Sequence, residues 1–72
     1  MVRFGTVVIV DHLNRYAIIR ENTSERKEFF VMPSDVSKTL GLKLVNQVTF
    51  QDDPDFVSTP VATQLIMLKR VA

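Results

Sequence analysis

Cysteine and tryptophan are absent from this 72-residue chain, and glycine and histidine are scarce, with two copies and one copy. The absence of cysteine excludes disulfides, thiolate zinc ligation and thiol catalysis together. No apolar run exceeds the four residues of Val7 to Val10. A transmembrane helix needs about 20 apolar residues and a signal peptide roughly 7–15. We therefore expect a cytosolic protein that does not associate with membranes.

Motifs for catalysis are also missing. The sequence has no Gly-x-Ser-x-Gly element and no glycine-rich phosphate loop, and His12 is its only histidine. Asp52, Asp53 and Asp55 offer oxygen atoms, but the glycine and the distal glutamate of a calcium loop are absent, so a charged turn is expected. We predict a protein that is not an enzyme, with no catalytic residue, no metal site and no cofactor.

The charges nearly balance. Nine basic residues against eight acidic ones leave a formal net charge of +1. Such a chain has no overall field that would attract nucleic acid or an anionic membrane. Any binding of a polyanion must therefore come from a local patch.

The apolar residues present are mostly β-branched. The chain holds 11 Val, 4 Ile and 6 Thr against 3 Ala. Side chains that are stiff at χ1 favour strands over helices, so the composition predicts an all-β protein. The length leaves room for one domain over residues 1–72, and a chain of this size buries only about 60% of its unfolded surface.

Five segments rich in Val, Ile, Thr and aromatic residues predict strands over residues 4–10, 16–20, 28–32, 44–51 and 61–69. An amphipathic helix is the alternative for residues 61–69. Pro33 should end the third strand, a short helical turn over residues 34–36 capped by Ser34 should follow, and residues 40–42 allow a chain reversal. A three-strand meander followed by a longer connection fits a small five-stranded antiparallel Greek-key barrel, the OB-fold.

Strand alternation assigns the faces of this barrel. The residues expected in the core are Val7, Ala17, Ile19, Phe29, Val31, Val48 and Phe50. The opposite face should carry an apolar patch with Arg15 and Arg20 at its border, and an open patch of this kind marks an interaction surface. Alternatively, a loop or the C-terminal segment covers part of the patch. The residues expected on the patch are Tyr16, Ile18, Phe30, Met32 and either Val8 or Val10.

Three blocks of the sequence match a known family pattern. They are Gly5-Thr6-Val7, residues 14–19 (Asn-Arg-Tyr-Ala-Ile-Ile) and residues 28–36 (Glu-Phe-Phe-Val-Met-Pro-Ser-Asp-Val), with further matches at residues 48–50 and 60–62. Together they resemble a cold shock domain along nearly the whole chain. The resemblance implies an OB-type barrel that binds single-stranded RNA or DNA on one face, as an RNA chaperone or regulator.

On this basis we predict weak binding of single-stranded nucleic acid with little sequence preference. Tyr16 and Phe30 are the two residues that remain aromatic at the family's base-stacking positions, and Arg15 and Arg20 could contact phosphates. The predicted nucleic-acid-binding residues are Val10, Arg15, Tyr16, Ile18, Arg20, Phe30 and Met32.

A second interpretation uses the same face for protein binding. Where the family carries Trp, Phe, His and Phe, this sequence has Ile9, Val10, Met32 and Pro33, which removes rings but keeps apolar area. Methionine is an adaptable filler at protein-binding surfaces. The face could therefore hold a protein partner or form a homodimer.

Overall fold

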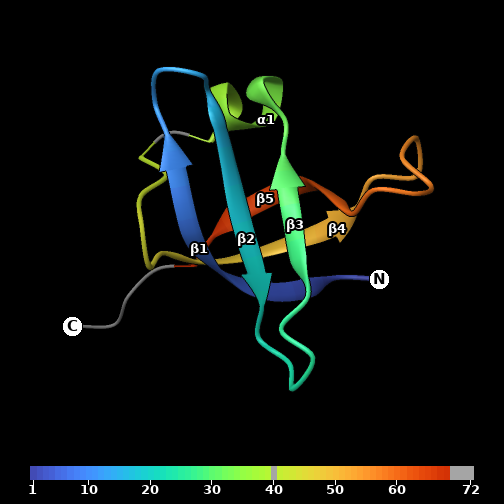
Figure 1. The fold of residues 1–72 in the computed structure, drawn as a ribbon. Coiled ribbons are helices and arrows are strands. Elements are labelled where there is room, and N and C mark those ends of the chain that lie inside the picture. Colours follow the sequence, from blue (N-terminus) through green and yellow to red (C-terminus); the bar gives the residue numbers. More distant parts are fainter. Residues whose placement is uncertain (40, 69–72) are drawn as a thin grey trace.

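A computed structural model describes residues 1–39 and 41–68 of the chain (Figure 1). Within these residues it contains five strands and one short helix. They are β1 (Arg3–Asp11), β2 (Tyr16–Glu21), β3 (Glu28–Val31), α1 (Pro33–Lys38), β4 (Gln47–Asp52) and β5 (Val61–Met67).

The strands close into a barrel in the order β1-β2-β3-β5-β4, with β4 paired back to β1 (Figure 1). Neighbouring strands are antiparallel except at the seam between β3 and β5. That seam is parallel because α1 and β4 lie between the two strands in the chain and return β5 in the direction of β3. The predicted all-β barrel of the OB type is confirmed, with one parallel seam in place of antiparallel pairing throughout.

The barrel interior holds the predicted core. Phe29 and Phe50 meet edge to face at its centre, with ring centroids 4.9 Å apart and an interplanar angle of 62°. Leu42 and Ala62 join the same cluster. All seven predicted core residues are fully buried, namely Val7, Ala17, Ile19, Phe29, Val31, Val48 and Phe50.

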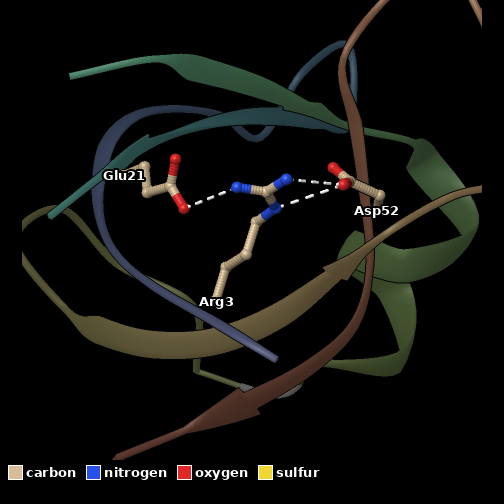
Figure 2. Close-up of polar contacts among 3 residues, drawn as sticks. All are labelled: Arg3, Glu21 and Asp52. Carbon is tan, nitrogen blue, oxygen red and sulfur yellow. Dashed lines mark hydrogen bonds and ion pairs between the residues drawn. The ribbon is translucent and has the colours of Figure 1, made fainter. Parts of the chain in front are cut away.

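Arg3, at the start of β1, forms ion pairs with residues at the ends of β2 and β4 (Figure 2). Its Nη1 donates to Glu21 Oε2 at the end of β2, and its Nη2 donates to Asp52 Oδ2 at the end of β4, both at 2.8 Å. These hydrogen bonds, that to Glu21 first, raise the pKa of the Arg3 guanidinium above its ordinary value. The guanidinium also lies 5.3 Å from the ring centroid of Phe29, so it covers the edge of the core.

The last two strands differ from the prediction at their ends. The chain turns at Val45, which has a φ of +60° and donates its N–H to the Val7 carbonyl at 2.8 Å. As a result β4 begins at Gln47 rather than Leu44. The last segment is a strand over Val61–Met67, so the alternative of a helix over residues 61–69 is wrong. Lys69, at the end of the predicted strand, lies outside the described residues.

Helix α1 begins at Pro33, one residue before the predicted turn over residues 34–36, and its cap is different. Met32 is the N-cap residue and no side chain caps the helix, so the prediction of Ser34 as the cap is wrong. Pro33 occupies the first turn, where its missing N–H would have no partner, and Ser34 therefore lies inside the helix. Gly41 has a φ of +77°, as a chain reversal requires, while Leu40 lies outside the described residues. In the described part of the chain, no helix has the length and apolar character needed to span a membrane.

Candidate nucleic-acid interface

A row of apolar side chains crosses the outer face of β1, β2 and β3. Ile18 pairs with Ile9 on one side and with Phe30 on the other. Tyr16 lies two residues before Ile18 and therefore on the same face of β2. Ile9 is 45% exposed and the other three residues are half-buried. We refer to Ile9, Tyr16, Ile18 and Phe30 as the outer apolar face.

The rings of Tyr16 and Phe30 stack on each other within the outer apolar face. Their centroids are 5.5 Å apart and their planes differ by 16°. The register explains the contact, since Phe30 is directly opposite Ile18 and its diagonal neighbour on β2 is Tyr16. The two rings form one aromatic surface at a partly exposed position, and an unpaired base can stack on such a surface.

Val10 does not belong to this face, and its prediction as a site residue there is corrected. The register between β1 and β2 shifts between Val7 and Ile9, as at a β-bulge. The shift places Ile9 outward, whereas Val10 pairs with Ala17 and packs against the core. Strict alternation predicts that Val10 points outward. The prediction is wrong because nothing in a run of four β-branched residues indicates where a bulge lies.

Met32 follows β3 directly and is half-buried. It also serves as the N-cap residue of α1, with the extended backbone angles of φ −69° and ψ 153°. Its place is therefore at the border between the outer apolar face and the helix.

Arg15 is exposed in the turn between β1 and β2, immediately before Tyr16. The turn is held by Asp11, whose carboxylate accepts hydrogen bonds from the Asn14 backbone N–H at 2.9 Å and from its side-chain amide at 3.0 Å. These two bonds, the backbone one first, hold the pKa of Asp11 below its ordinary value. Arg15 makes no ion pair with any residue that the structure describes. Its guanidinium is therefore available to a phosphate beside the aromatic pair.

Arg20 lies on the predicted side of β2, but it has a partner. Its Nη2 donates to Glu28 Oε2 at 2.8 Å, directly across the β2–β3 pair. Both side chains are about half exposed, at 43% and 52%. The pair partly neutralises the charge that is predicted from the sequence to contact phosphate. This ion pair could have been predicted from the sequence, because a hairpin between residues 20 and 28 places these opposite charges directly across from each other.

The loop between β4 and β5 projects to one side of the barrel (Figure 1). The Asp55 backbone N–H donates to Asp53 Oδ1 at 3.0 Å, and a hollow of about 330 Å³ lies between the loop and Lys27. Phe56 in this loop is 41% exposed. Its aspartates would repel phosphate, and no group of three or more metal-ligating side chains converges within residues 1–39 and 41–68.

No family model, curated protein or solved structure matches the chain. The features that bear on function are therefore the OB-type barrel, the outer apolar face and the arginines around it.

Proposed function

We propose that this chain is a binding protein rather than an enzyme, and that it binds single-stranded RNA or DNA on the outer apolar face. The observation that carries the proposal is the parallel pair of rings formed by Tyr16 and Phe30 at a partly exposed position. Bases stack on aromatic side chains in sequence-tolerant binding of single strands. The resemblance to a cold shock domain supports the same face, and the expected location is the cytosol.

The proposed binding is weak and has little sequence preference. Each stacked base contributes about 1–3 kcal/mol as judged by alanine substitution, and one ring pair provides for one or two bases. Arg15 is exposed beside the pair, whereas Arg20 is bound to Glu28. Few phosphates are neutralised in this arrangement, so affinity should depend only modestly on salt.

Titration of labelled oligo-U and oligo-dT at low salt tests the proposal. We expect both to bind, and we expect the Tyr16→Ala/Phe30→Ala double variant to lose most of the affinity. Phe4→Ala is the matched control, because Phe4 is 56% exposed on β1, pairs with Thr49 of β4 and is not paired with any residue of the outer apolar face. Absence of binding, or equal weakening by the control and the double variant, would refute the proposal.

A second candidate is self-association or binding of a protein partner through the same face. The observation that favours it is the row of Ile9, Ile18 and Phe30, in which two of the three side chains are aliphatic. In a closed symmetric dimer Ile18 would lie near the centre. Sedimentation at tens to hundreds of micromolar distinguishes the two: a dimer dissociated by Ile18→Lys, with no response to oligonucleotide, favours protein binding. A monomer whose NMR spectrum shifts with oligonucleotide favours nucleic acid.

A further inference from the structure

A second concave region lies on the outer surface of β1 and β2, at the end of β2 opposite to Tyr16. It has a volume of about 480 Å³ and is lined by Thr6 and Val8 of β1, Arg20 of β2, and loop residues 22–24 and Arg26. Strand alternation places Arg20 on the same side of β2 as Tyr16 and Ile18. The region therefore continues the outer apolar face toward the β2–β3 loop.

The charged residues that line this pocket are two arginines and one glutamate. Glu21 also borders it, but Glu21 pairs with Gly5 on the inward side, its carboxylate is bound to Arg3 at 2.8 Å, and its side chain is only 11% exposed. Arg20 shares its charge with Glu28, whereas Arg26 makes no ion pair within the described part of the chain. Of the two arginines in the lining, Arg26 is thus the one without an ion-pair partner among the residues described.

Two polar residues of the lining, Thr6 and Asn22, belong to a closed ring of hydrogen bonds that includes Gln47. Thr6 Oγ1 donates to Asn22 Oδ1 at 2.8 Å, Asn22 Nδ2 donates to Gln47 Oε1 at 2.8 Å, and Gln47 Nε2 donates to Thr6 Oγ1 at 2.9 Å. The ring satisfies these three groups and anchors the start of the loop. The hydroxyls of Thr23 and Ser24 have no hydrogen-bond partner among the residues described, so they remain available to a ligand.

The backbone at Arg26 has a conformation that is uncommon for arginine. Its φ of +51° lies in the left-handed region, which glycine and asparagine adopt most easily. The conformation is set by the turn, in which the Arg26 N–H donates to the Thr23 carbonyl at 3.1 Å. An arginine therefore occupies a position whose backbone favours glycine, so an exchange to glycine can remove the guanidinium without adding backbone strain.

We propose that this pocket binds a phosphate group, held by the Arg26 guanidinium and the hydroxyls of Thr23 and Ser24. Arginine forms charge-assisted, often bidentate hydrogen bonds to phosphate, and hydroxyls supplement them. The inference rests on the proposed function in one respect, namely that the phosphate belongs to a strand whose bases stack on Tyr16 and Phe30. Tyr16 and Arg20 are four positions apart on β2, a span of roughly 13 Å, which a short single-stranded oligonucleotide can cover.

The test compares Arg26→Gly with Lys38→Ala. Glycine removes the guanidinium and relieves the left-handed backbone, so thermal stability should be unchanged or higher. Lys38 lies in the last turn of α1, at the other end of the barrel from the β2–β3 loop (Figure 1), and its substitution removes the same charge. For oligo-dT we expect Arg26→Gly to weaken binding several-fold at low salt and to reduce the slope of log K against log salt by about 0.7, with no change of slope for Lys38→Ala.

A titration with inorganic phosphate provides an independent readout. Amide NMR shifts concentrated at Thr23, Ser24 and Arg26, and lost in Arg26→Gly, support the phosphate site. If these shifts occur but no oligonucleotide binds, the site takes a free phosphate and the proposed function fails. If oligonucleotide binds through Tyr16 and Phe30, with an unchanged slope in Arg26→Gly and no phosphate shifts in the loop, the phosphate site is refuted and the proposed function stands.

Discussion

Gly5 lies so close to Ile19 that a Cβ at Gly5 would overlap the Cγ2 atom of Ile19. The same Cβ would lie 2.9 Å from Cε1 of Phe50 and 3.0 Å from the Arg20 carbonyl oxygen. Ile19 and Phe50 are fully buried, so neither side chain can move aside freely. We predict that Gly5→Ala lowers the free energy of unfolding by about 1–3 kcal/mol, measured by chemical denaturation. An unchanged denaturation midpoint would contradict this packing.

Arg3→Lys should destabilise the barrel although the charge is kept. Arg3 reaches Glu21 and Asp52 with different nitrogens of one planar group, and a lysine ammonium cannot reproduce this geometry. Because the contacts are partly exposed, the expected loss is about 1 kcal/mol. Thermal unfolding measures it, and Lys43→Arg, an exchange at an exposed loop position, is the control. Equal midpoints for Arg3→Lys and the wild type would show that the three-residue contact adds no stability.

The Asp11–Asn14 contact predicts a pH dependence of stability. The folded-state pKa of Asp11 is below its ordinary value of 3.8, so its contribution is fully present above that value and is lost as pH falls through the lower folded pKa. Unfolding midpoints measured from neutral pH down to about pH 2 should therefore fall less steeply in Asp11→Asn than in the wild type. Asn14→Ala should give an intermediate curve, because the backbone N–H still donates. Parallel curves for all three proteins would exclude the contact as a source of acid sensitivity.

Glu28→Gln should increase affinity for single strands. The substitution removes the carboxylate that holds Arg20 at 2.8 Å, so the guanidinium becomes available to phosphate. One further neutralised phosphate steepens the salt dependence of log K by about 0.7 for a single strand. Glu25→Gln makes the same charge change in the exposed loop and serves as the control. If both variants gain equally, the effect is one of net charge and Arg20 has no specific role.

The core could be predicted from the sequence because its signal is local. Alternation within single strands assigned Ala17, Ile19, Phe29 and Val31 to the interior, and all four are fully buried. Alternation also predicts that Tyr16 and Ile18 lie on the same face, because side chains two residues apart on one strand point the same way.

Features that depend on irregular backbone or on distant partners could not be predicted. The bulge in β1 that turns Val10 inward arises from how β1 must curve to pair with both β2 and β4. The contact between Arg3 and Asp52 joins residues 49 positions apart, and only the closed barrel brings them together. The left-handed backbone at Arg26 likewise depends on loop geometry. No pattern in the sequence therefore predicts the pocket beside it.

The parallel seam between β3 and β5 has a kinetic consequence. It contains two registered pairs, Phe30↔Val61 and Val31↔Ala62, whereas β1 and β2 share six. The meander of β1, β2 and β3 joins segments close in sequence and should form early, while the seam joins distant segments and should form last and open first. Phe30 belongs to both the seam and the aromatic pair, so each opening event exposes one side of the surface on which a base would stack. A ligand bound to that surface would therefore keep the β3–β5 pairing closed and slow amide hydrogen exchange across the seam.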